Sequence, residues 1–60
     1  MDFKTAKTLK VGDKVYVKKT MALFTIEAID YQETQDFRGF YFLCSDGEKR
    51  YHTTVQPYRD

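Results

Sequence analysis

The sequence is poor in the residues that hold other very small proteins together. It has one cysteine, Cys44, so no internal disulfide can form, although small secreted domains usually depend on several. Its one histidine, His52, together with that cysteine falls short of the four ligands of a structural zinc site. We therefore expect no bound metal and no cofactor, and a fold that depends on its apolar core alone.

Long hydrophobic runs are also lacking. No stretch approaches the roughly 18 apolar residues that a membrane span requires, and the first residues show no signal-peptide pattern. Because the cysteine content also suits a reducing compartment, we expect a cytoplasmic protein with no membrane partner.

Glycine is too scarce for a phosphate-binding loop, since Gly12, Gly39 and Gly47 are scattered. Cys44 and His52 are the only candidate nucleophile and base, and we expect them on opposite faces of a hairpin, out of mutual reach. Paired carboxylates for acid–base chemistry would have to come from an acidic stretch that we interpret as a solvated surface: Glu27, Asp30, Glu33 and Asp36. We therefore expect no enzymatic activity.

Sixty residues leave room for one domain, which we expect to span residues 1–60. A chain of this length buries only about 60% of the surface that its unfolded form exposes, so a single core must stabilise it. We expect a monomer or a weak homodimer, because assembly with a partner can supplement so small a core.

Aromatic residues are abundant, with five phenylalanines and five tyrosines, and this composition favours strands. Alternating apolar residues and turn signals predict five strands, at residues 14–18, 21–29, 37–44, 49–53 and 55–58. The polar residues 30–36 are expected to form a loop or a flaring hairpin. The predicted core comprises Leu9, Val15, Val17, Phe24, Ile26, Phe40, Phe42 and Val55.

Two places allow more than one local structure. Phe3, Ala6 and Leu9 are spaced by three, which fits one short helical turn or an irregular start. We favour a loosely ordered lead-in over residues 1–8, after which Leu9 packs on the core. Gly39, inside a strand, indicates a bulge or a close approach of the backbone to another group.

The pair Asp46 and Gly47 predicts a tight hairpin turn, because both central residues of such a turn need positive φ. A two-residue loop would pair Phe42 with Tyr51 and leave Tyr41, Arg50 and His52 facing outward. A three-residue loop would exchange the faces. We favour the two-residue loop.

Three segments together resemble a known superfold. They are KVGDKVYV at residues 10–17, DGEKRY at residues 46–51 and VQPY at residues 55–58. In this order they look like the small Src-homology-3-like (SH3-like) barrels, which include Tudor-like, KOW-like and many uncharacterised bacterial and phage domains. The resemblance implies an all-β, five-stranded, partly open barrel, and a binding role in a bacterial or phage setting.

Charge is balanced overall at +1 but not along the chain. Residues 1–20 carry six lysines against two aspartates, giving +4, while residues 21–36 carry four acids and no base, giving −4. One hypothesis is therefore a nucleic-acid interface, in which basic groups attract phosphate while an exposed ring stacks on a base. Its expected residues are Lys14, Tyr16, Lys18, Arg38 and Arg50.

We favour a second hypothesis, a protein- or peptide-interaction module. The sequence has more aromatic groups than a small core absorbs, and we expect four of them in a shallow groove: Tyr16, Phe37, Tyr41 and Tyr58. Beside an acidic loop, such a groove would suit a peptide of basic or proline-rich character.

Overall fold

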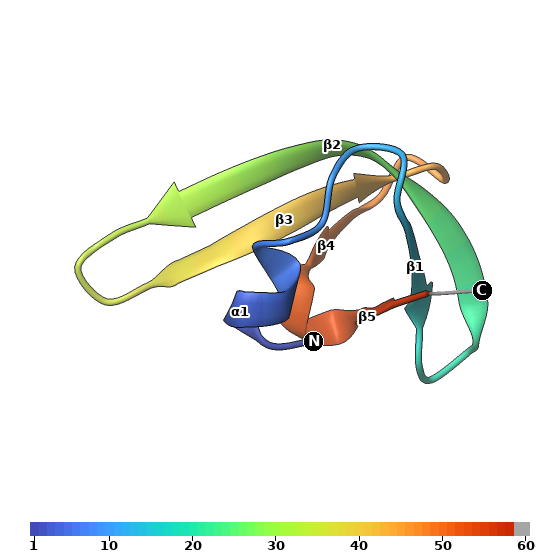
Figure 1. The fold of residues 1–60 in the computed structure, drawn as a ribbon, viewed down its shortest axis with the longest axis horizontal. Coiled ribbons are helices and arrows are strands. Elements are labelled where there is room, and N and C mark those ends of the chain that lie inside the picture. Colours follow the sequence, from blue (N-terminus) through green and yellow to red (C-terminus); the bar gives the residue numbers. More distant parts are fainter. Residues whose placement is uncertain (59–60) are drawn as a thin grey trace.

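The computed structural model describes residues 1–58, and these form one antiparallel sheet of five strands in the order β4-β3-β2-β1-β5 (Figure 1). The last two residues of the expected domain, 59 and 60, lie outside the described residues. The strands are β1 (Lys14–Val17), β2 (Ala22–Glu33), β3 (Arg38–Cys44), β4 (Lys49–Tyr51) and β5 (Gln56–Pro57). A helix α1 (Phe3–Ala6) precedes them, and a 3-10 turn η1 (His52–Thr54) joins β4 to β5. The expectation of a small all-β domain is confirmed.

The longest strand, β2, belongs to both halves of the sheet. Residues 22–25 pair with β1, and the part from Ile26 to Glu33 pairs with β3. A bulge interrupts the pairing between Ile26 and Ala28, and a bulge bends a strand and increases its twist. The bend directs β1 and β5 across the end of the β2–β3 ribbon instead of extending it flat (Figure 1).

The expected end of this strand was wrong. β2 continues through residues 30–33 instead of ending at residue 29, and these residues pair with β3 as far as Glu33 opposite Arg38. Of the two structures expected for residues 30–36, a loop or a flaring hairpin, the hairpin is the one that forms. The Tyr31 ring lies 5.0 Å from that of Phe40, so an aromatic contact stabilises this polar part of the ribbon.

The core lies between the bent sheet and α1. Its fully buried apolar residues are Ala6, Val15, Ile26, Phe42, Cys44 and Val55. Leu9, Val17, Phe24 and Phe40 are half-buried and pack against them. All eight predicted core residues are therefore in the core or against it.

The first residues are not the loosely ordered lead-in that we expected. The Asp2 carboxylate caps α1 by accepting a hydrogen bond of 2.8 Å from the Thr5 amide, as residues of this kind do at helix starts. Ala6 is 1% exposed, and the Met1 ammonium donates to the carbonyl oxygens of His52 and Val55. The helix thus covers the end of the core beside η1.

The β3–β4 hairpin has a three-residue loop, so the two-residue prediction was wrong. Phe42 pairs with Arg50 instead of Tyr51, and the Gly47 amide donates to the carbonyl of Cys44 across the turn. Of the two loop residues proposed for the turn, only Gly47 has positive φ, whereas the expected turn type needs it at both.

This shift of one residue also corrects the expected faces. Arg50 lies on the same face as Phe42, and His52 is buried in η1, so neither points outward as expected. Tyr51 joins Tyr41 on the outer face of the sheet, with ring centroids 5.2 Å apart.

Gly39 is a point of close approach, as the sequence indicated, whereas the bulge lies in β2. A Cβ at Gly39 would stand 2.5 Å from a Tyr51 ring carbon and 2.9 Å from His52 Cε1. Only glycine fits there while the Tyr51 ring keeps its place.

We expect Gly39→Ala to lower the free energy of unfolding by about 1–3 kcal/mol, because the added methyl overpacks this contact. Urea denaturation measures the loss. In a Tyr51→Ala background the same substitution should cost less, because the ring it meets is gone. Equal losses in both backgrounds would contradict the assigned contact.

His52 is a buried histidine in its neutral form. It is 3% exposed, and its Nδ1 accepts a hydrogen bond of 3.2 Å from the Phe40 amide, which requires that nitrogen to be unprotonated. Burial lowers the pKa of His52 below its ordinary value of 6.5. The nearby charged groups are the Met1 ammonium and the Asp2 carboxylate.

Because the unfolded chain binds a proton at His52 more readily than the folded one, stability must fall as pH drops below about 6.5. We expect the melting temperature to decrease steadily from pH 7.5 to pH 5. His52→Gln removes the titrating group and keeps an acceptor for Phe40, so its profile should be flatter in that window. An unchanged slope in this variant would exclude His52 as the source.

Candidate functional site

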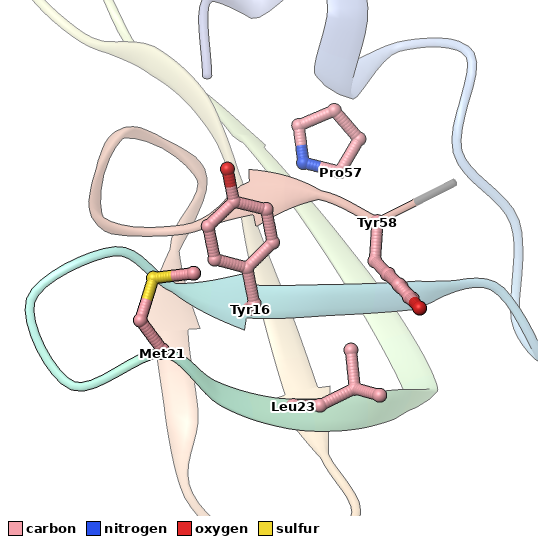
Figure 2. A pocket seen from close by; sticks show the side chains of 5 residues that line it. All are labelled: Tyr16, Met21, Leu23, Pro57 and Tyr58. Carbon is pink, nitrogen blue, oxygen red and sulfur yellow. The ribbon is translucent and has the colours of Figure 1, made fainter. Parts of the chain in front are cut away.

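An open apolar groove of about 630 Å³ lies on the outer side of β1, β2 and β5. Its lining residues are Tyr16, Met21, Leu23, Pro57 and Tyr58. Figure 2 shows Leu23 pointing toward the space between Tyr16 and Tyr58, with Met21 at the side next to the β1–β2 turn. Three of the five large hydrophobic residues exposed in the described chain line this groove, namely Met21, Leu23 and Tyr58.

Strand pairing explains how these side chains come together. In β1 the buried Val15 alternates with Lys14 and Tyr16, which must therefore face outward. Tyr16 is directly opposite Leu23 of β2, and directly opposed residues share a face. The β5 strand pairs on the other side of β1, with Gln56 opposite Tyr16 and Pro57 opposite Val15. Pro57 and Tyr58, which follows it, line the β5 side of the groove.

Met21 is unusual in its backbone as well as in its exposure. Its φ is +59°, and it is the only non-glycine residue with positive φ among the described residues. The side chain is nevertheless 69% exposed. The left-handed conformation costs a residue with a side chain roughly 1–2 kcal/mol, so this turn carries a cost that a glycine or asparagine would reduce.

Basic side chains lie next to the groove on its β1 side. Lys14 precedes Tyr16 by two residues on the same face, and Lys18 and Lys19 follow β1 in the turn. All three are exposed, and no ion pair within residues 1–58 involves them. The β1 border of the groove is therefore cationic.

The four aromatic residues that we expected in one groove divide between two places. Tyr16 and Tyr58 line the groove described above. Phe37 and Tyr41 instead pack with Tyr51 on the outer face of β3 and β4, where the Phe37 and Tyr51 ring centroids are 5.3 Å apart. Met21, Leu23 and Pro57 were not among the residues expected in the groove, although the alternation of a strand puts Leu23 on the face opposite that of Phe24.

The expected nucleic-acid face is divided as well. Lys14, Tyr16 and Lys18 lie together, but the Arg38 guanidinium stacks on the ring of Phe3 at 4.3 Å. Arg50 lies on the core side of the sheet, where it stacks on Phe24 at 4.3 Å. Neither arginine therefore extends the lysine and tyrosine surface of β1.

Arg50 also forms a paired contact with Asp46 in the β3–β4 loop. Its two terminal nitrogens donate to the two carboxylate oxygens at 2.9 and 2.8 Å. This bidentate geometry is the strongest that arginine and carboxylate adopt. It lowers the pKa of Asp46 to about 2, chiefly through the hydrogen bonds from Arg50, and raises that of Arg50.

The acidic segment is not beside the groove, as we had expected it to be. Glu33 and Asp36 flank the β2–β3 turn, which lies at one end of β2, whereas the β1–β2 turn lies at the other end. Figure 1 shows the acidic hairpin projecting from the body, far from β1 and β5. The groove was expected beside acidic residues, whereas basic residues lie beside it.

Cys44 and His52 are both buried and have separate partners. The Cys44 thiol donates to the Phe42 carbonyl at 3.7 Å, and His52 accepts from Phe40. Within residues 1–58, no three His, Cys, Asp or Glu side chains are grouped as metal ligands would be. The same residues include no helix long and apolar enough to cross a membrane.

No protein-family model matches this chain, and neither a curated protein nor a solved structure is significantly similar to it.

The Asp46–Arg50 pair gives a pH dependence with a definite sign. A folded pKa of about 2, below the ordinary 3.8, means that the pair stabilises the fold above about pH 4 and loses this effect as pH falls toward 2. A carbon-detected NMR titration should give an Asp46 midpoint near 2 in the native protein. In Arg50→Gln the midpoint should return toward 3.8, and an unchanged midpoint would contradict the assigned cause.

Proposed function

We propose that this chain is a non-catalytic binding module that takes a short segment of a partner protein in the groove between Tyr16 and Tyr58. The observation that carries the proposal is the gathering of exposed Met21, Leu23 and Tyr58 around one concave surface. Large exposed apolar groups in one place mark interaction sites in small proteins. Tyrosine is among the residues that dominate binding energy at such sites.

The backbone at Met21 supports the same proposal. Met21 exposes a large apolar side chain to solvent and also adopts a left-handed backbone conformation, and both features are unfavourable. Natural sequences keep such features mainly where function requires them. Contact with a bound segment is a function that explains both the exposure and the strain.

We further propose that the domain is a variant of the small SH3-like barrels. The first four strands form a meander, a 3-10 turn follows, and β5 returns to pair with β1. A long bent second strand shared by the two halves of the sheet also fits this proposal. β4 and β5 are the two edge strands of the sheet, so the barrel that we propose is partly open.

A nucleic-acid interface is the second candidate. It is favoured by the exposed Lys14 and Lys18 on either side of Tyr16, since lysine attracts phosphate and tyrosine can stack on a base. Two of its five expected residues, Arg38 and Arg50, are engaged elsewhere with Phe3, Phe24 and Asp46. For this reason we place the protein partner first.

Selection from a random 12-residue peptide library on the immobilised protein tests the proposal. We expect the selected peptides to lose roughly 30-fold in affinity for Tyr16→Ala, because a central tyrosine contact contributes about 2 kcal/mol. Tyr41→Ala on the outer face of β3 is the matched control and should bind normally.

The variant Met21→Asn separates an effect on binding from an effect on stability in the same experiment. Asparagine tolerates positive φ, so this variant should be as stable as the native protein or more stable by up to about 1 kcal/mol, yet bind the selected peptides more weakly. Peptides that depend on Tyr41 and ignore Tyr16 would move the site to β3 and β4. Failure to select any peptide would contradict the proposed function.

A further inference from the structure

We propose that the segment bound in the groove is acidic, with a leucine- or phenylalanine-type side chain next to aspartate or glutamate residues. This inference rests on the proposed function and adds the chemistry of the partner. The apolar part follows from the lining by Met21, Leu23 and two tyrosine rings, which suits an aliphatic or aromatic side chain. The acidic part follows from the charges around it.

Among the described residues, basic groups outnumber acidic ones on the β1 side of the groove. Lys14, Lys18 and Lys19 are exposed and form no ion pair within residues 1–58. None of the groove's five lining residues carries an acid. Glu27 is the first acid along β2 and stands four residues from Leu23, which corresponds to about 13 Å of strand.

Among the described residues, one aspartate, Asp13, lies next to this border. Asp13 precedes Lys14, and its carboxylate accepts a hydrogen bond of 2.9 Å from the Lys10 amide. Its charge offsets one of the three lysines, so the border keeps a net positive charge within the described residues, and a carboxylate from a partner is the group that complements it.

The edge of the sheet argues for recognition through side chains. β5 is an edge strand of two residues, and one of them, Pro57, has no amide hydrogen to donate. A partner strand cannot extend the sheet along such an edge with a regular set of hydrogen bonds. Apolar contact in the groove and charge at its border must then supply the affinity and the orientation.

The chain's own acidic hairpin is a poorer occupant than a separate partner. Its turn exposes Glu33 and Asp36, but the residues between them, Thr34 and Gln35, are polar. Of the large hydrophobic side chains near this turn, Phe37 packs against Tyr51. Tyr31 is half exposed, but its ring packs on Phe3 and Phe40 and its hydroxyl donates to Glu33. A second copy would therefore offer the charge without the apolar side chain that fills the groove.

Three capped nine-residue peptide pools test the inference. Each pool has leucine, phenylalanine or methionine at its centre, and the flanks are aspartate and glutamate, lysine and arginine, or serine and glutamine. We expect amide NMR shifts at Tyr16, Leu23 and Tyr58, and tighter binding of the acidic pool by roughly 3- to 10-fold over the neutral one at low salt. The preference should shrink at physiological ionic strength, because salt screens exposed charges.

Paired variants assign the effect to the border. Lys14→Gln combined with Lys18→Gln should remove the preference for the acidic pool and leave binding of the neutral pool unchanged. Lys4→Gln combined with Lys7→Gln is the matched control, since it removes the same charge from exposed positions in and just after α1. An equal effect of both pairs would show attraction by net charge alone and would overturn the inference.

The other outcomes separate this inference from the proposed function. Equal binding of all three pools at the groove would overturn the acidic preference and leave the binding module standing. If no pool binds and the 12-residue library also yields nothing, both fail. Salt-sensitive shifts with oligothymidylate but not with the pools would replace the protein partner by nucleic acid. Amide NMR shifts at the groove that depend on protein concentration alone would replace the proposed protein partner by a second copy of this chain.

Discussion

The positions of β1, β5 and the groove all follow from the bend of β2 at the bulge between Ile26 and Ala28. Before the bulge the strand pairs with β1, and beyond it with β3, so one chain segment holds both halves of the sheet together. Ile26 is 1% exposed and packs in the core at the bend. Without the bend, β1 and β5 would extend a flat sheet, and one face of so small a sheet would stay uncovered.

The bend also separates the two outer surfaces of the domain. The β1, β2 and β5 part carries the groove with Tyr16 and Tyr58, and the β3 and β4 part carries the packed rings of Phe37, Tyr41 and Tyr51. The second cluster is held by Gly39, whose missing side chain leaves room for the Tyr51 ring. The aromatic rings of this second cluster cover the outer face of β3 and β4, whereas those of the groove remain accessible to a partner.

Alternation along single strands could be predicted from the sequence, and pairing between strands could not. The order of Lys14, Val15 and Tyr16 was enough to put valine inside and the other two outside. The hairpin loop at Asp46 and Gly47 was not determined, because an Asp-Gly pair fits a two-residue loop and also a three-residue loop in which glycine alone has positive φ. That difference of one residue moved Arg50 to the core side and left Tyr51 outside.

The candidate site was predictable only in part for the same reason. Tyr16 and Tyr58 stand out as aromatic residues, but Leu23 joins them only through its register opposite Tyr16, and Met21 only through a turn with an unusual φ. The charge of the surroundings depended on where β2 ends. Once residues 30–33 extend the strand, the acids are carried to its far end and the lysines remain with the groove. Phe37 and Tyr41, the expected groove residues nearest these acids, pack on the β3–β4 face instead, so the partner charge that we propose for the groove changes from basic to acidic.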